Sequence, residues 1–198
     1  METARESEYP RQGAGDPHGP IWAPAESDVP NRKRRWFWKA GEEQYLYSLD
    51  ELVDLYYHSV GRNTNLLFGM VIDDRGLVPE ADAARFGEFG AAIERRFRAK
   101  MGETAGRGDD LLLDLGGSKP VSHVIIKENI AEGERVRAYV LQGLVGGTWL
   151  DLAHGTCIGH KRIERFRRVR LSQIRLRCLA SVAPPSIASL AAYDVTAD

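Results

Sequence analysis

Cysteine is scarce in this sequence of 198 residues, which contains only Cys157 and Cys178. Two cysteines cannot form a disulfide framework, so we expect both to be buried thiols. The sequence also lacks an apolar leader of the signal-peptide type and any apolar run of about eighteen residues. It therefore predicts no membrane partner, and it leaves the cellular location open, with the cytoplasm as the default.

The common catalytic and metal-binding motifs are missing as well. The sequence has no GxSxG elbow, no P-loop, no HExxH and no CxxC. Its five histidines, at positions 18, 58, 123, 154 and 160, do not have the spacing of metal ligands. We therefore expect no metal and no cofactor, which leaves carboxylates as the candidates for catalysis.

The sequence also has no excess of positive charge, since its formal net charge is -1. This argues against a nucleic-acid partner. Two segments are locally basic. The run Asn31–Arg35 precedes Trp36-Phe37-Trp38 and could bind nucleic acid or an acidic sugar. Alternatively, it is a solvated loop whose aromatic rings tuck under the neighbouring helix. The segment from Lys161 to Arg177 is either an anion site or the solvated face of a strand.

An α/β pattern follows the first basic run. Ser48 and Glu51 have the spacing of a capping box ahead of an apolar run, which predicts a helix. Gly61 is expected to end this helix in the left-handed conformation. The segment Asn65–Phe68 is short and continuously apolar, as in a strand that is covered on both faces. Pro79 is then expected to open a second helix.

The pattern changes after the Gly-rich segment from Gly102 to Gly108, which we interpret as a domain boundary. Beyond it, apolar residues alternate with period two, and Gly146-Gly147 is a typical hairpin turn. Trp149, next to this turn, is expected in the core. Short strands are expected at 111–115, 122–127, 135–144, 148–153, 157–163, 173–179 and 187–193. This spacing predicts an antiparallel β-sandwich or jelly roll.

The best candidate for a catalytic carboxylate is Glu26, in the loop that begins at Trp22. An indole beside a glutamate disfavours the charged carboxylate, which raises its pKa and suits a general acid. The indole could also serve as a floor for the apolar face of a sugar ring. The alternative is an ordinary exposed carboxylate in a loop.

Three blocks of residues share a recognisable pattern. They are WAPAESDV and WFW at 22–29 and 36–38, LVDLYY, SVGRN and NLL at 52–57, 59–63 and 65–67, and IKENI, GERV and IGHKR at 126–130, 133–136 and 158–162. Together they resemble the C-terminal part of the α-L-fucosidases of glycoside hydrolase family 29, over nearly the whole chain from about Gly15 to Tyr193.

The resemblance implies an α+β chain. Residues 1–35 would form a loop-rich N-terminal segment with an active-site loop, and residues 36–101 the end of the catalytic barrel. Residues 109–198 would form an antiparallel β-sandwich of the galactose-binding type. The first part would thus be a remnant of a (β/α)8-like barrel, which needs about 250 residues when complete. Because neighbouring barrel strands are missing, we expect residues before about Pro79 to be poorly ordered or sticky.

The resemblance also implies hydrolysis of α-L-fucosyl linkages in oligosaccharides or glycoconjugates, with retention. Glu26 would be the acid/base, and Trp22, Trp36 and Trp38 would contact the substrate. Retention needs a second carboxyl about 5 Å away, and no residue matches the family's nucleophile Asp. The chain is therefore expected to be inactive unless a missing N-terminal barrel half is supplied. Whether it is itself an enzyme stays open. The alternative is a carbohydrate-binding or structural β-sandwich module without catalysis.

Overall fold

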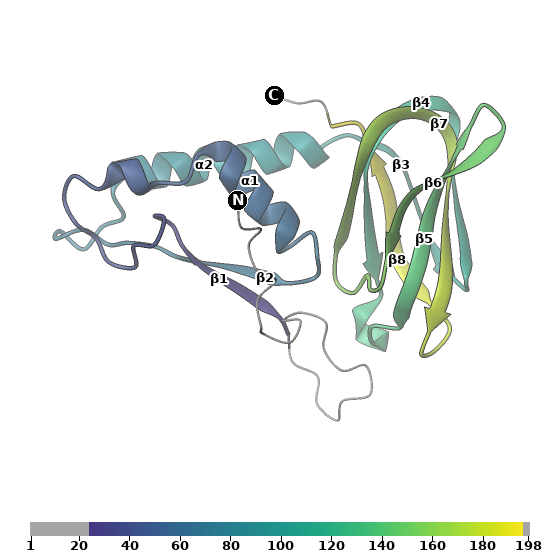
Figure 1. Ribbon diagram of the computed structural model, residues 1–198, viewed down its shortest axis with the longest axis horizontal. Helices are drawn as coiled ribbons and strands as arrows, with labels where there is room; N and C mark the ends of the chain where they lie inside the picture. The colour runs from purple at the N-terminus through teal and green to yellow at the C-terminus, as the bar shows by residue number, and fades with distance from the viewer. Residues whose placement is uncertain (1–23, 196–198) are drawn as a thin grey trace, which may run out of the picture.

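The computed structural model describes residues 24–195 and shows two parts that pack side by side (Figure 1). The first part is an α/β unit and the second is a six-stranded sheet. The elements of the α/β unit are β1 (Glu26–Pro30), α1 (Leu49–His58), β2 (Asn65–Gly69) and α2 (Glu80–Phe97). The strands of the sheet are β3 (Lys100–Arg107), β4 (Asp110–Glu128), β5 (Val136–Val145), β6 (Thr148–Gly155), β7 (Arg162–Ser181) and β8 (Ser186–Tyr193).

Helix α1 begins where the sequence predicts. The Ser48 hydroxyl accepts a bond of 3.3 Å from the Glu51 amide, and the Glu51 carboxylate accepts one of 2.8 Å from the Ser48 amide. The Glu51 carboxylate accepts hydrogen bonds from Lys33 and from the Ser48 amide and hydroxyl, which lower its pKa to about 2. Leu52, Val53 and Tyr57 are buried on the inner face of the helix, so the helix predicted from the capping box and the apolar run is confirmed.

The end of α1 differs from the expectation in one detail. Gly61 does not take the left-handed conformation; Asn63 does, with φ 65°. Gly61 is needed for a different reason, because a Cβ atom there would lie 2.5 Å from the Tyr57 carbonyl oxygen. The turn therefore depends on close backbone approach rather than on a positive φ.

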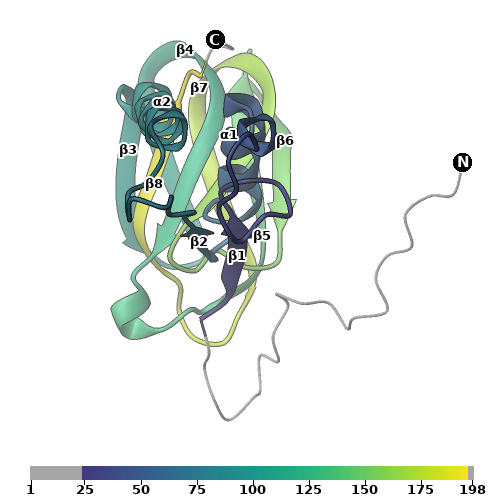
Figure 2. The ribbon, with the colours of Figure 1, turned by 90° about the vertical axis from the view of Figure 1, so that its left-hand side faces the viewer.

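Strands β1 and β2 pair in parallel, with Glu26 opposite Asn65 and Val29 opposite Phe68. The Phe68 ring contacts Phe86 of α2 edge-on, with the ring centroids 4.9 Å apart. The helices therefore cover one face of the pair. Figure 2, which views the molecule from the side of the α/β unit, shows both helices in front of the sheet and the strand pair below the helices.

The second part is a single antiparallel sheet with the order β3-β8-β4-β7-β5-β6. Strands β4 and β7 are long and arch over the top of the sheet, so that its two halves face each other (Figure 1). Strand β4 bends where Gly116 and Gly117 take φ values of 71° and 137°, and its register against β7 shifts there. Fifteen buried residues, among them Leu141, Ile174 and Leu190, fill the space between the halves. The predicted antiparallel sheet is confirmed.

Two segments of the sheet differ from the sequence-based expectation. The Gly-rich segment interpreted as a boundary belongs to β3, which pairs with β8, so the sheet begins at Lys100 rather than near Asp109. A Cβ atom on Gly102 would lie 2.9 Å from the Leu115 side chain, so this glycine serves close packing. In addition, most of the strand expected at 157–163 is a loop. Gly159 in this loop has φ 61°, and a Cβ atom there would collide with the side chain of Asn63.

The α/β unit and the sheet meet at a second apolar cluster, which includes Val53, Tyr57 and Ala92 from the helices and Ile125 and Tyr193 from the sheet. Residues 24–78 were expected to be poorly ordered or sticky. In the described part of that segment, Val53 and Tyr57 are buried against the sheet, and the expectation itself stays a prediction. No helix in residues 24–195 is long and apolar enough to cross a membrane.

Polar bonds reinforce this junction. The Asn63 side chain donates to Glu134 at 3.1 Å and accepts from the His160 amide at 2.7 Å. The Ile163 amide donates to the Gly61 carbonyl at 2.9 Å. These bonds fix the loop after α1 against the start of β7.

Candidate functional site

The candidate site is the face of the β1–β2 pair that turns away from the helices. Side chains alternate along a strand, so Glu26 and Asp28 of β1 share this face with Asn65 and Leu67 of β2. All four are exposed, and 52% of the Leu67 surface is accessible. We call these four residues, together with Trp36, the open face.

Trp36 lies at the far end of the same face. Its ring packs over Gly69, where a Cβ atom would lie 2.8 Å from the indole, and half of the Trp36 surface is exposed. Phe37 is 86% exposed and Trp38 is half-buried. The expectation that these aromatic rings tuck under the neighbouring helix is therefore wrong for Trp36 and Phe37. The Trp36 indole instead lies over Gly69, which has no side chain, at the edge of the open face.

Glu26 begins β1, and its position is held by the bond of 2.9 Å from the Asn65 amide to the Ala25 carbonyl. Its side chain is exposed. Trp22, which was expected beside it, lies outside the described residues. Asp28 is two residues further along the same strand, so its Cα lies about 7 Å from that of Glu26. The two carboxylates point the same way and do not face each other across a gap.

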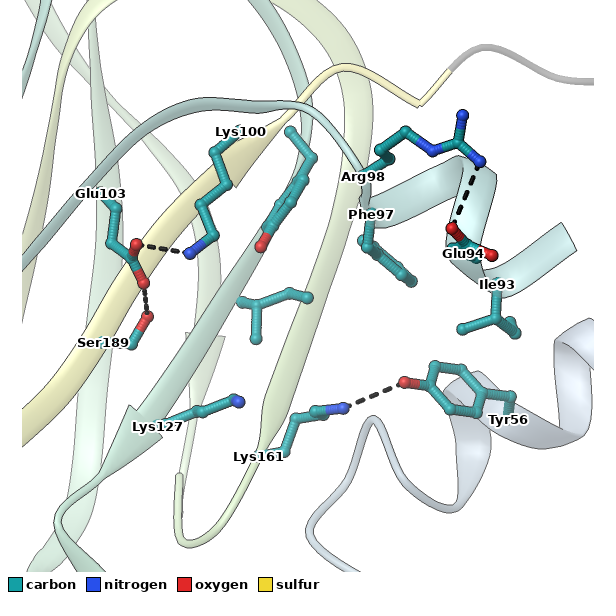
Figure 3. Close-up of a pocket in the computed structure, with 12 residues that line it drawn as sticks. Tyr56, Ile93, Glu94, Phe97, Arg98, Lys100, Glu103, Lys127, Lys161 and Ser189 are labelled. Carbon is teal, nitrogen blue, oxygen red and sulfur yellow. Dashed lines mark hydrogen bonds and ion pairs between the residues drawn. The ribbon is translucent and has the colours of Figure 1, made fainter. Parts of the chain in front are cut away.

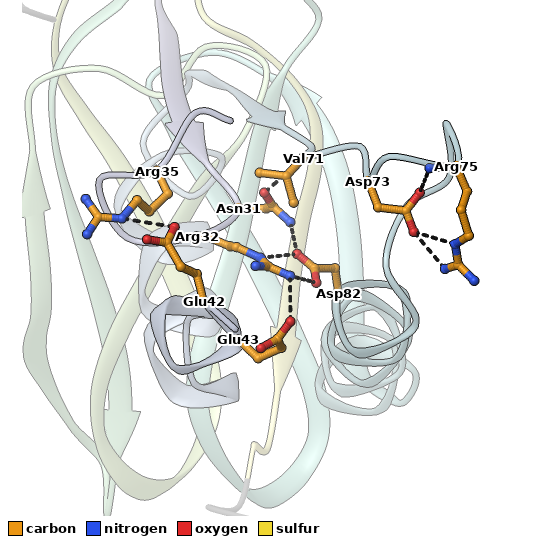
Figure 4. Close-up of polar contacts among 9 residues, drawn as sticks. All are labelled: Asn31, Arg32, Arg35, Glu42, Glu43, Val71, Asp73, Arg75 and Asp82. Carbon is orange, nitrogen blue, oxygen red and sulfur yellow. Dashed lines mark hydrogen bonds and ion pairs between the residues drawn. The ribbon is translucent and has the colours of Figure 1, made fainter. Parts of the chain in front are cut away.

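A buried ion pair supports the loop between Glu26 and Trp36 (Figure 4). Arg32 donates from Nε and Nη2 to the two oxygens of Asp82, at 3.0 and 2.8 Å, and both side chains are fully buried. Asn31 donates to the same carboxylate at 2.6 Å and accepts from the Val71 amide at 3.1 Å. The hydrogen bond to Asp82 raises the pKa of Arg32. This cluster ties the ends of β1 and β2 to the first turn of α2.

Lys33 and Arg35 of the first basic run are also paired with carboxylates, whereas Arg34 is exposed. Lys33 lies 2.6 Å from Glu51, and Arg35 lies 3.3 Å from Glu42. These contacts leave the run little free charge for a nucleic acid. The sequence gives no signal for the Arg32–Asp82 pair, because its members lie fifty positions apart.

The basic segment of β7 behaves as the solvated face of a strand. The exposed Arg168 bonds Asp194 at 2.7 Å, and the exposed Arg177 lies 3.2 Å from Asp110. Arg162 differs, because it bonds the buried Glu164 at 2.8 Å. The guanidinium of another member, Arg175, stacks on Trp149, 4.4 Å from its ring.

Trp149 itself was expected in the core, but it is only half-buried. The indole has one face under the Arg175 guanidinium, which keeps it at the surface of the sheet. Both cysteines are half-buried and free, and burial raises the pKa of Cys178 to about 11. Within residues 24–195, no group of three or more His, Cys, Asp or Glu residues is placed to hold a metal ion.

Comparison with known proteins gives a consistent result. No protein-family model matches the chain. α-L-fucosidase 1 of Arabidopsis thaliana is 28% identical over 191 residues, which cover 78% of this chain and 37% of the Arabidopsis protein. A protein of Oryza sativa subsp. japonica, whose name also refers to α-L-fucosidase 1, is 30% identical over 91% of this chain and 41% of its own length. The chain thus spans about two fifths of the curated relatives it matches.

Solved structures extend the likeness to the fold. A crystal structure from Bacteroides thetaiotaomicron that is described by the name α-L-fucosidase superposes with a TM-score of 0.89 at 40% identity, covering 92% of this chain and 43% of that one. A glycoside hydrolase 29 family member from a rumen bacterium superposes with a TM-score of 0.83 at 31% identity, over 93% of this chain and 36% of its own. The resemblance found in the sequence is confirmed, and the chain is a relative of the α-L-fucosidases of glycoside hydrolase family 29.

Proposed function

We propose that this chain is the C-terminal portion of a retaining α-L-fucosidase and that the open face is its share of the sugar-binding pocket. One observation carries the proposal. A parallel strand pair has helices on one face, while no other part of residues 24–195 covers its second face, which presents Glu26, Asp28 and the Trp36 indole. Parallel strands are usually covered on both faces, so the bare face implies a further neighbour.

The order β1-α1-β2-α2 supports a barrel origin for this unit. In a (β/α)8 barrel the strands are parallel, the helices form the outer ring and the other face of each strand points into the barrel. Each of β1 and β2 also has only one partner within residues 24–195, so each has a free edge. We therefore infer that residues 36–101 are the last part of a barrel and that residues 1–35 carry an active-site loop. The sheet that follows would be a sandwich of the galactose-binding type.

The chemistry assigned to the open face is that of the acid/base. Glu26 would protonate the oxygen of the leaving group and then, as a carboxylate, take a proton from the attacking water. Trp36, with Trp38 and Trp22, would offer apolar surface to the fucosyl ring. The nucleophile must approach from the opposite side of the scissile bond, and Asp28 cannot do so because it points the same way as Glu26. The second carboxyl would therefore come from a complementary barrel half.

A hybrid protein tests this assignment. It joins the part of the Bacteroides thetaiotaomicron protein outside its matched region to residues 1–198 of this chain. We expect the hybrid to hydrolyse 4-nitrophenyl α-L-fucoside with retention, as followed by the anomer of the product, and the 198-residue chain alone to be inactive. A folded hybrid without activity, or turnover by the chain alone, would contradict the proposal.

The role of Glu26 is tested in the same hybrid. Glu26→Gln removes the base of the second step and should lower kcat by about 100-fold or more. Azide, which needs no base, should restore turnover and give the fucosyl azide. The matched control is Glu80→Gln, which neutralises an exposed carboxylate in the first turn of α2. Equal activity of the Glu26→Gln and parent hybrids would rule out the acid/base role.

The alternative is a carbohydrate-binding or structural module without catalysis. It is favoured by the absence, within residues 24–195, of a second carboxylate that faces Glu26. Binding of fucosylated oligosaccharides by the 198-residue chain, together with an inactive hybrid, would support this alternative.

A further inference from the structure

A groove of about 330 Å³ lies between the end of α2 and the sheet (Figure 3). It shares no residue with the open face. The aromatic rings of Tyr56, Phe97 and Tyr193 contribute to its walls, and aliphatic side chains lie between them. Its volume is at the lower end of the range typical of small-ligand sites, about 300–1,000 Å³. The groove can therefore take a ligand of the size of one or two sugar residues.

Four cationic and two acidic side chains line the groove, and within residues 24–195 only two of the cations are paired with a carboxylate. Lys100 lies 2.5 Å from Glu103, and Arg98 lies 3.3 Å from Glu94. These contacts account for both carboxylates that line the groove.

The two remaining cations, Lys127 and Lys161, have no carboxylate within ion-pair distance anywhere in residues 24–195. Lys161 donates one hydrogen bond to the Tyr56 hydroxyl at 3.0 Å, so two of the three ammonium hydrogens can still bind an anion. Figure 3 shows both lysine side chains on the same side of the groove. A net positive charge thus remains beside an aromatic surface.

We propose that this groove binds a sugar residue that carries an anionic group, either a carboxylate or a sulfate ester. The aromatic rings would contact the apolar face of the sugar, and Lys127 and Lys161 would pair with the anion. The class of ligand, a glycan, rests on the proposed function. The location and the anionic group rest on the groove itself. The site would recognise an acidic residue of a glycan away from the open face.

The full 198-residue chain can be tested by amide NMR titration with four probes. These are methyl β-D-glucuronide, methyl β-D-galactoside 6-sulfate, neutral methyl β-D-glucoside and inorganic sulfate. We expect at least one acidic glycoside to shift amides around Phe97, Lys127 and Lys161, and to bind about tenfold more tightly than the neutral one. Whichever acidic glycoside binds more tightly shows whether the groove prefers a carboxylate or a sulfate ester. Added salt should weaken the binding of that glycoside.

Variants assign the binding to the groove. The double substitution Lys127→Gln and Lys161→Gln should weaken the acidic glycoside about tenfold, whereas Arg34→Gln with Lys39→Gln, which removes two exposed charges elsewhere, should not. Phe97→Leu should weaken the glycoside but not inorganic sulfate. Thermal melts confirm that each variant folds, and the single variant Lys161→Gln tests the same pairing with the smaller change.

Three results would overturn the proposal. They are no binding of either acidic glycoside, equal binding by the lysine double variant and the parent, and equal binding of the acidic glycosides and inorganic sulfate with no effect of Phe97→Leu. None of these measurements depends on hydrolysis or on Glu26. A failure here is therefore distinct from a failure of the fucosidase assignment.

Discussion

The β1–β2 pair and the six-stranded sheet differ in how their faces are covered. The sheet folds over itself, so its two halves cover each other and enclose one apolar core. The strand pair is covered by helices on one face only and leaves Leu67 half exposed on the other. The sheet completes its own core, whereas within residues 24–195 nothing covers the second face of the strand pair. Four predictions test this difference, from the largest expected effect to the smallest.

The largest effect is expected at the buried ion pair of the α/β unit. Asp82→Ala leaves the Arg32 guanidinium buried without its bidentate partner, which should destabilise the chain by about 3–5 kcal/mol. Urea unfolding measures the loss, and hydrogen exchange should show that the α/β unit opens before the sheet. Asp74→Ala removes an exposed carboxylate of the same unit and is the control. An unchanged urea midpoint in Asp82→Ala would contradict the importance of the pair.

A matched pair of leucines compares the two regions directly. Leu176 is fully buried in the sheet core and Leu67 is on the open face. Leu176→Ala should lower the free energy of unfolding by about 2–5 kcal/mol, and Leu67→Ala by less than about 1 kcal/mol. Similar losses for the two variants would mean that the open face is already covered, for example by association of two chains. Sedimentation would then reveal the association.

The junction between the regions should respond to pH through His123. Burial, with smaller effects from Arg165 and Arg96, lowers the pKa of His123 to about 4, and its Nε2 lies 3.0 Å from the Tyr57 hydroxyl. The unfolded chain therefore binds a proton more readily than the folded one. This contribution to stability is present above about pH 6.5 and is lost as the pH falls toward 4, by roughly 1–3 kcal/mol.

Urea midpoints between pH 7 and pH 5.5 measure this loss, because carboxylates such as Glu51, whose pKa is lowered on folding, change stability mainly below about pH 5. In His123→Gln the pH dependence over this window should flatten. His154→Gln, which changes an exposed histidine, is the control. A slope that persists unchanged in His123→Gln would assign the effect to another group.

The smallest effect is expected at the cap of α1. Ser48→Ala removes the acceptor for the Glu51 amide and should destabilise the chain by about 1 kcal/mol. Ser118→Ala, in the exposed bend of β4, should change stability by less than about 0.5 kcal/mol. Thermal unfolding of both variants separates a capping effect from a general loss of a hydroxyl.

Local signals in the sequence were sufficient for much of the fold. The capping box at Ser48 and the apolar period predict α1, and Gly146-Gly147 predicts the hairpin between β5 and β6. The period-two pattern predicts an antiparallel sheet. These features depend on residues that are close together in the chain, so their physical cause can be read directly from the sequence.

Features that depend on distant residues were not predictable. The glycines of β3 looked like a linker, but Gly102 allows close contact with Leu115, which only the folded sheet brings near. Arg32 finds its partner, Asp82, fifty positions away. Within the candidate site, Glu26 and Trp36 could be chosen from their chemistry. Their place on one face with Asn65 and Leu67 follows from the parallel register of β1 and β2, which the sequence alone did not specify.

The continuity of β4 and β7 has a mechanical consequence. Each strand runs through both halves of the folded sheet, so one half cannot slide over the other without breaking the ladder between these two strands. The loop after α1 is hydrogen-bonded to the start of β7 through Gly61. A tilt of the folded sheet would therefore move the helices and the strand of Glu26 with it, as one rigid body.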